Sequence, residues 1–181
     1  MDSFEAIVGL LLQKEGYWVR RSVKVNLTPK EKKKIRRHSS PRWELDLVAY
    51  KAKSNELLVV ECKSLLDSRG VTAQGVSGKG RKNLYKLFND SVLRKTVLNR
   101  LVKELVESDS CASFPSVTLC LAAGKIAREA DRENIKKLFE RNGWRLFDDS
   151  WLSKRLKSLG ERKSGYENEV ASVVAKLLLR E

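Results

Sequence analysis

Hydrophobic positions follow two periodicities along this 181-residue chain. Short apolar runs, alternating or continuous, predict strands over residues 17–27, 43–50, 57–64, 116–123 and 143–149. Apolar residues at helical spacing predict helices over residues 2–14, 82–107, 127–141, 150–159 and 163–181. Gly16 is a stop signal for the first helix, and Ser150 is a candidate N-cap. This order of elements predicts an α/β fold.

Two of the predicted strands carry charged residues among apolar ones. Asp46 lies in the segment WELDLVAY (43–50), and Glu61 and Lys63 lie in LLVVECKS (57–64). The polar stretch between them, 51–56, suits a hairpin turn. The sequence therefore predicts a hairpin that holds two acids and a lysine on apolar strands.

The register of this hairpin decides whether the charges meet. A turn centred on 53–54 places Asp46 opposite Glu61, and a turn centred on 54–55 places it opposite Lys63 with Glu61 diagonal. Directly opposed residues have Cβ atoms roughly 4.5–5.5 Å apart. A one-residue slip would send the two acids to opposite faces. Both favoured registers gather two carboxylates and one ammonium into a cluster.

Strand alternation also assigns the faces of the first of these strands. Leu45, Leu47 and Ala49 are expected on one face, and Glu44 and Asp46 on the other. Glu44 is therefore a reserve ligand beside Asp46.

This combination of side chains suits a divalent metal. Two close carboxylates repel each other, so one pKa rises unless a cation lies between them. Mg²⁺ or Mn²⁺ fits because hard cations prefer oxygen ligands, and such a metal can activate water for phosphodiester hydrolysis. Lys63 can orient the attacking water or stabilise the phosphoryl charge. The alternative is an ordinary Lys–Glu pair across strands on a solvated face.

The pattern of Asp46 followed by Glu61-Cys62-Lys63 resembles the motif of the PD-(D/E)XK nuclease superfamily. Leu45 stands where that motif has its Pro, which is a departure. The predicted order of one helix and three strands, with the acids on the second and third strands, resembles the core of this superfamily. The resemblance implies a restriction-endonuclease-like core, with a central mixed β-sheet of about five strands flanked by helices.

Two further features bear on the resemblance. Members often supply another acid from the first helix, where this chain has Glu5; the helix dipole also favours an acid in a first turn. The acidic turn Asp148-Asp149 after the last strand resembles the Mrr-type branch. Glu61 stands where that branch usually has Gln, which brings the chain nearer to the resolvase-like members.

The resemblance implies a metal-dependent DNA endonuclease, structure-selective for branched DNA or restriction-like or repair-like. Asp46, Glu61 and Glu5 would be catalytic residues and ligands of Mg²⁺ or Mn²⁺, and Lys63 would be catalytic. Because cutting two strands commonly takes two sites, we expect a homodimer. The alternative is a catalytically inactive nucleic-acid-binding module of the same fold, or an assembly subunit.

Composition narrows the class of protein. The length predicts one domain over 1–181, and the formal net charge of +14 favours a nucleic-acid partner. The absence of a signal-peptide pattern or a long apolar span predicts no membrane association and a cytoplasmic location, nucleoid-associated if the source is prokaryotic. Cys62, Cys111 and Cys120 lack the spacing of a metal site.

The positive charge is concentrated in two segments. Residues 28–42 hold seven Lys or Arg against one acid; Pro29 and Pro41 bracket this segment, which predicts a basic loop. A Gly-rich loop over 67–82 follows the second charged strand. A merely solvated charge run is the alternative explanation. The residues expected to bind nucleic acid are Arg20, Arg21, Lys30, Lys32, Lys33, Lys34, Arg36, Arg37, Arg42, Lys79, Arg81 and Lys82.

Overall fold

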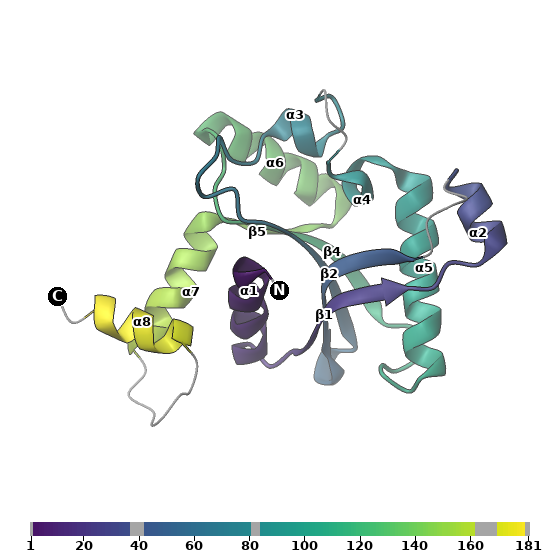
Figure 1. Ribbon diagram of the computed structural model, residues 1–181, viewed down its shortest axis with the longest axis horizontal. Helices are drawn as coiled ribbons and strands as arrows, with labels where there is room; N and C mark the ends of the chain where they lie inside the picture. Colours follow the sequence, from purple (N-terminus) through teal and green to yellow (C-terminus); the bar gives the residue numbers. More distant parts are fainter. Residues whose placement is uncertain (1, 37–41, 81–83, 162–169, 180–181) are drawn as a thin grey trace.

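The computed structural model describes residues 2–36, 42–80, 84–161 and 170–179, which form an α/β structure around a five-stranded mixed sheet (Figure 1). The strand order is β1-β2-β3-β4-β5. The first three strands are antiparallel neighbours, and β4 and β5 continue the sheet in parallel with β3. The strands are β1 (Trp18–Val25), β2 (Trp43–Lys51), β3 (Glu56–Lys63), β4 (Ser116–Ala123) and β5 (Arg145–Phe147). The predicted α/β class, with a central mixed sheet of about five strands flanked by helices, is confirmed.

Most helices begin and end where the sequence carries capping signals. In α1, Asp2 accepts a hydrogen bond of 2.8 Å from the Phe4 amide, and Gly16 follows the helix with φ 89°. The helices are α1 (Ser3–Lys14), α2 (Pro29–Lys34), α3 (Ala73–Val76), α4 (Lys86–Asn89), α5 (Ser91–Glu107), α6 (Glu129–Asn142), α7 (Asp149–Glu161) and α8 (Val170–Leu178), with a 3₁₀ turn η1 (Ala52–Ser54). Within the described ranges, each helix falls short of the length and apolarity that crossing a membrane requires.

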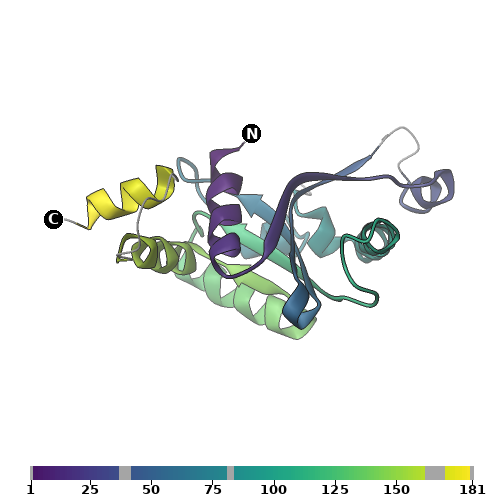
Figure 2. The same ribbon diagram turned by 90° about the horizontal axis from the view of Figure 1, so that it is seen from below.

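Two hydrophobic cores lie on opposite faces of the sheet (Figure 2). The first core lies between the sheet and helices α3 to α6, where Val59 packs with Leu101 and Phe139. The second lies under α1 and α7, where Val60 packs with Val8. Because β3 is covered on both faces, its sequence is a nearly continuous apolar run, and a charged residue on it is therefore unusual.

The prediction of one long helix over 82–107 is wrong, because the described residues there form two helices, α4 and α5. The Asp90 side chain accepts a hydrogen bond of 2.9 Å from the Leu93 amide and so begins α5 anew. The Arg94 guanidinium donates to the carbonyls of Leu87 and Phe88, which closes α4. Residues 81–83 lie outside the described residues, as do 162–169 and 180–181 of the helix predicted over 163–181.

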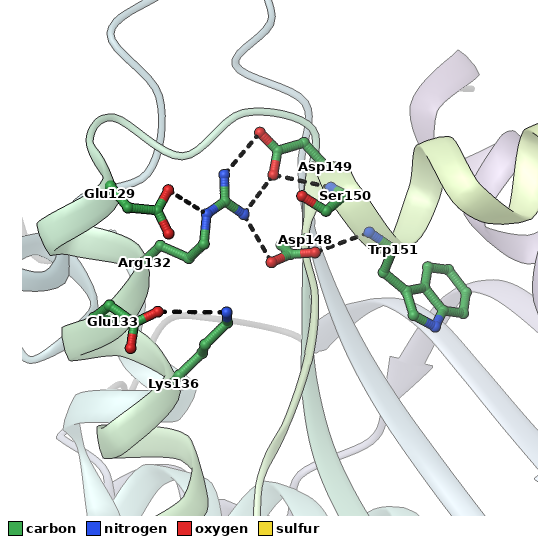
Figure 3. A network of polar contacts seen from close by, with 8 residues as sticks. All are labelled: Glu129, Arg132, Glu133, Lys136, Asp148, Asp149, Ser150 and Trp151. Carbon is green, nitrogen blue, oxygen red and sulfur yellow. Dashed lines mark hydrogen bonds and ion pairs between the residues drawn. The ribbon is translucent and has the colours of Figure 1, made fainter.

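The two carboxylates of the acidic turn between β5 and α7 are bound by one arginine (Figure 3). The Arg132 guanidinium binds Asp148 at 2.7 Å, Asp149 at 2.6 Å and Glu129 at 3.0 Å. These bonds join the first turn of α6 to the start of α7, and Arg132 lowers the pKa of Asp149. Asp148 also accepts a hydrogen bond of 2.9 Å from the Trp151 amide. The predicted N-cap at Ser150 is therefore wrong, because the carboxylate two residues earlier caps the helix.

The basic loop predicted over 28–42 is wrong over 29–34, which form α2. Thr28 and Glu31 make a capping box, with bonds of 2.7 Å from the Thr28 amide to Glu31 and 3.3 Å from the Glu31 amide to Thr28. Pro29 occupies a first-turn position that helices favour, so it begins a helix where the sequence was expected to leave a loop. Residues 37–41 lie outside the described residues.

Candidate functional site

The β2–β3 hairpin brings the charged residues of the predicted site together. Tyr50 pairs with Leu57 and Leu47 pairs with Val60, a register centred on 53–54. Of the two predicted registers, the one centred on 53–54 is therefore confirmed over these pairs, and the ladder ends one residue before Asp46 and Glu61.

Asp46 is held by the neighbouring strand. Its Oδ2 accepts a hydrogen bond of 2.7 Å from the amide of Cys62, just beyond the Leu47–Val60 pair. The carboxylate thus accepts a hydrogen bond from a β3 amide, as main-chain carbonyls of β2 do along the rest of the ladder. This bond fixes one oxygen of Asp46 beside the peptide that joins Glu61 to Cys62.

The faces of β2 exchange at Asp46, so the predicted common face of Leu45, Leu47 and Ala49 is wrong. Leu45 packs in the first core, whereas Leu47 and Ala49 pack in the second. On β1, Ser22 lies between the residues that pair with Leu47 and Leu45, and it has a left-handed φ of 49°. The register of β1 on β2 is the same before and after Ser22, so no residue is inserted, and the alternation of faces breaks where the ladder skips Ser22 and Asp46. Parity alone therefore cannot assign the face of Asp46.

Glu61 and Lys63 form an ion pair at the end of β3. The Lys63 Nζ lies 2.7 Å from Glu61 Oε1, and the side chains are 19% exposed for Glu61 and 28% for Lys63. Burial raises the pKa of Glu61 above its ordinary value; Lys63 opposes this rise and Asp46 adds to it. Burial works against the ammonium of Lys63, but Glu61 and Asp46 outweigh it and raise that pKa. Lys63 is therefore positively charged at neutral pH.

Glu5 adds a third acid to this region from α1. It is half-buried, and burial, followed by the charge of Asp46, raises its pKa. Glu44, exposed on β2, contributes to the same rise. Glu5 thus lies within electrostatic range of Asp46 and Glu44.

The chain after β3 passes very close to the chain after β4. Lys63 pairs with Ala123, and the Gly124 amide donates a hydrogen bond of 2.9 Å to the Lys63 carbonyl. A Cβ on Gly124 would lie 2.4 Å from the Ser64 carbonyl oxygen. Glycine at this position lets the two strand ends meet and fixes the backbone that carries Lys63.

Tyr85 is a neighbour of the cluster that the sequence did not indicate. It is 4% exposed. Burial raises its pKa, Lys63 lowers it and Glu61 raises it, so the phenol lies within electrostatic range of both. Its ring packs against Gly75, where a Cβ would lie 3.2 Å from Tyr85 Cε2. Tyr85 fell inside an apolar helical pattern, and no local sequence signal distinguishes it from a core residue.

The predicted nucleic-acid-binding residues are mostly exposed, and two groups of them are contributed by β1 and α2. Helix α2 lies beside α5 (Figure 1), and the Asn26 amide donates a hydrogen bond of 3.0 Å to Glu104. Residues Arg20, Arg21, Lys30, Lys33, Lys34, Arg36, Arg42 and Lys79 are exposed, and Lys32 is half-buried. The remaining candidates, Arg37, Arg81 and Lys82, lie outside the described residues.

The donor atoms of the site suit a hard cation with few protein ligands. Among the described residues, no three His, Cys, Asp or Glu side chains form a ready metal cage. Mg²⁺ is commonly held by one or two carboxylates together with waters and phosphates. Asp46 uses Oδ2 and Glu61 uses Oε1 in the contacts above, so each has a second oxygen outside those contacts. Burial strongly raises the pKa of the Cys62 thiol, so the metal-free protein holds it as a neutral thiol.

No family model, curated protein or solved structure matches this chain. The geometry of the β2–β3 hairpin and its neighbours is therefore the basis for a functional assignment.

Proposed function

We propose that this protein is a metal-dependent DNA endonuclease of the PD-(D/E)XK superfamily, with a restriction-endonuclease-like fold. The observation that supports it is the excess of acid at the hairpin. Asp46 and Glu61 directly follow the last pair of the β2–β3 ladder, Glu61 has a raised pKa, and Lys63 is the ammonium paired with it. A divalent cation would relieve this repulsion.

In this proposal Asp46 and Glu61 hold Mg²⁺ or Mn²⁺, and Glu5 completes the site directly or through water. The bound metal supplies Lewis acidity to the phosphodiester and lowers the pKa of a water molecule. Lys63 donates hydrogen bonds to the attacking water or to the phosphoryl oxygens. The Cys62 amide holds Asp46 in place at 2.7 Å, so this carboxylate needs little rearrangement.

The substrate follows from the charge of the protein. A net charge of +14, with exposed Arg20, Arg21 and the lysines of α2, attracts a polyanion. We expect affinity for DNA to fall steeply as salt rises, because each phosphate contact releases counterions.

Cleavage assays test the proposal directly. Plasmid, branched and single-stranded DNA are incubated with Mg²⁺ or Mn²⁺ and wild type, Lys63→Ala or Asp46→Asn. Lys53→Ala is the matched control, because Lys53 is an exposed lysine on the same hairpin. We expect cleavage by wild type and Lys53→Ala, and a loss of at least about 100-fold in the other two. Equal inertness of wild type and Lys63→Ala on every substrate would contradict the proposal.

Thermal unfolding separates an enzyme from a module that only binds DNA. At a Mn²⁺ concentration of about 100 times its Kd, a metal site in the folded state adds about 2.7 kcal/mol of stability. We expect this gain in wild type and Lys53→Ala and its loss in Asp46→Asn. A DNA-binding wild type that Mn²⁺ does not stabilise would favour the binding module.

A further inference from the structure

A cavity lies at the end of the sheet where the β2–β3 hairpin turns, opposite the end that carries Lys63. Its volume is about 710 Å³, within the range of roughly 300–1,000 Å³ that is usual for ligand pockets. Trp18 and Arg20 of β1, Tyr50 of β2, Leu105 of α5 and Asp109, which follows α5, line it. Gln13 of α1 also lines it, so the cavity is bounded by the edge of the sheet and by the C-terminal ends of two helices.

Trp18 is the most unusual residue of this cavity. Its side chain is 85% exposed, although tryptophan is highly buried on average. Trp18 pairs with Tyr50 across the two strands. An indole so placed has a face available to another flat ring.

The loop behind the cavity is held in one conformation by hydrogen bonds. The Tyr50 hydroxyl accepts from the Ala112 amide at 3.1 Å and donates to Asn55 Oδ1 at 3.0 Å. Asn55 in turn donates to the Ser113 carbonyl at 3.0 Å. The cavity is therefore formed before any ligand arrives, which reduces the ordering cost of binding.

The chemistry of the walls matches a nucleotide. Trp18 offers a stacking surface, and Arg20, two residues along the same strand, offers a cation on the same side of it. Asp109 and Ser110 line the cavity with groups that can hydrogen-bond a base edge. A base inside a duplex is stacked on both faces and cannot reach such a pocket, whereas an unpaired base can.

We propose that this cavity binds an unpaired nucleotide of the DNA substrate, with its base on Trp18 and its phosphate at Arg20. This inference rests on the proposed function and names its substrate class. Tyr50 and Asp46 are four residues apart on β2, which is about 13 Å along a strand. An unpaired nucleotide held here keeps the adjoining DNA near Asp46. The substrate is then DNA with unpaired nucleotides close to the cleaved bond, such as a flap, an overhang or an open branch.

A binding experiment without metal tests the inference. Fluorescently labelled single-stranded and blunt duplex oligonucleotides of equal length are titrated in EDTA at fixed salt. Trp18→Ala is compared with Trp18→Phe and with Phe114→Ala. Phe114 is the matched control, because it is 96% exposed at the same end of the sheet and is not among the cavity-lining residues. Thermal melts establish that each variant is folded.

We expect Trp18→Ala to weaken single-strand binding about 5- to 150-fold, the range for one stacked base, and to leave duplex binding unchanged. Trp18→Phe should retain most of the affinity, and Phe114→Ala should retain all of it. Arg20→Gln should reduce the salt dependence of single-strand binding by about one phosphate, whereas Lys53→Gln should not. Equal losses in Trp18→Ala and Phe114→Ala, or equal losses for single strand and duplex, would overturn the inference.

Competition with a free deoxynucleoside monophosphate distinguishes DNA from a small ligand. Binding of the free nucleotide that depends on Trp18, without any effect of Trp18 on single-strand affinity, would also overturn the inference. The two proposals fail separately. If single-strand binding depends on Trp18 but the protein cleaves no DNA, the nuclease proposal alone fails. If the protein cleaves DNA but its binding does not depend on Trp18, the cavity proposal alone fails.

Discussion

The two ends of β3 each carry a glutamate, and their environments differ. Glu56 begins the strand and Glu61 lies near its end, and their side chains are 20% and 19% exposed. The pKa of Glu56 is nevertheless lowered and that of Glu61 is raised. Equal exposure therefore does not mean an equal electrostatic state.

Two things differ: the carboxylate of Glu61 is more deeply buried than that of Glu56, and different groups meet each carboxylate. Burial favours the neutral acid of Glu56, but hydrogen bonds from Tyr17 and Arg145 outweigh it. Tyr17 donates to Oε2, and Arg145 donates to Oε1 at 2.8 Å. Glu61 is also buried; it pairs with the ammonium of Lys63 and is repelled by the carboxylate of Asp46. At the Glu56 end, both carboxylate oxygens accept a hydrogen bond. At the Glu61 end, the carboxylates of Glu61 and Asp46 meet the single ammonium of Lys63.

This contrast distinguishes a structural carboxylate from a candidate functional one. A structural acid is satisfied inside the protein, whereas a catalytic acid is often left with a perturbed pKa until substrate or metal arrives. The comparison can be tested by making the same substitution at each of the two glutamates.

The largest expected effect is on DNA cleavage. We predict that Glu61→Gln lowers the cleavage rate at least about 100-fold, because it removes a metal-binding charge. Glu56→Gln should stay within about threefold of wild type, because it lies at the other end of the strand. The measurement is single-turnover cleavage at saturating Mn²⁺. A similar loss in both variants would erase the distinction between the two ends.

The next effect is on stability without metal, and it runs the other way. Glu56→Gln should lower the free energy of unfolding by about 1–3 kcal/mol, because Arg145 loses its charged partner and Tyr17 loses an acceptor. Glu61→Gln should change it by less than about 1 kcal/mol, since relief of the repulsion with Asp46 offsets the lost pair with Lys63. Urea unfolding at neutral pH in EDTA measures both. A larger loss in Glu61→Gln would show that this end of β3 is the structural one.

The smallest effect is in the pH dependence of stability, where the two glutamates should act in adjoining windows. The ordinary value for both is 4.5. Glu56 has a lowered pKa, so its contribution is present above about that value and is lost as pH falls through the folded pKa. Glu61 has a raised pKa, so the folded state binds its proton more tightly and stability falls as pH rises from about 4.5 through the folded pKa.

Replacing each glutamate by Gln should therefore flatten a different part of the stability curve. The difference in the free energy of unfolding between wild type and Glu56→Gln should change with pH below about 4.5. The difference between wild type and Glu61→Gln should change above it. Urea titrations across this range in EDTA measure both differences. Changes of the same sign in the same window would contradict the assigned shifts.

The predicted elements came from strong local signals. The five strands and α1 follow from apolar runs and the stop at Gly16, which act within a few residues. The hairpin register could be narrowed to two alternatives because its turn is short and polar. The break at Asp90 was missed because the apolar helical pattern continues on both sides of it.

The candidate site was predicted less completely than the elements. Asp46, Glu61 and Lys63 stand out because charges are unusual on apolar strands. Tyr85 does not stand out, because an aromatic residue in a helical pattern is normally core. The predicted faces of β2 were wrong because the alternation breaks where the β1–β2 ladder skips Asp46 and Ser22, and the left-handed φ of Ser22 is not indicated by its residue type.

The sequence by itself determined the five strands, helices α1, α6 and α7, and which strands carry unusual charge, because hydrophobic periodicity is local. Only the tertiary structure decided that Asp46 is bound by the Cys62 amide, that Glu56 accepts hydrogen bonds from Tyr17 and Arg145, and that Glu61 is not satisfied in the same way. These contacts join residues far apart in the chain. Their free energies depend on packing, burial and neighbouring charge, which become fixed when the sheet and its helices assemble.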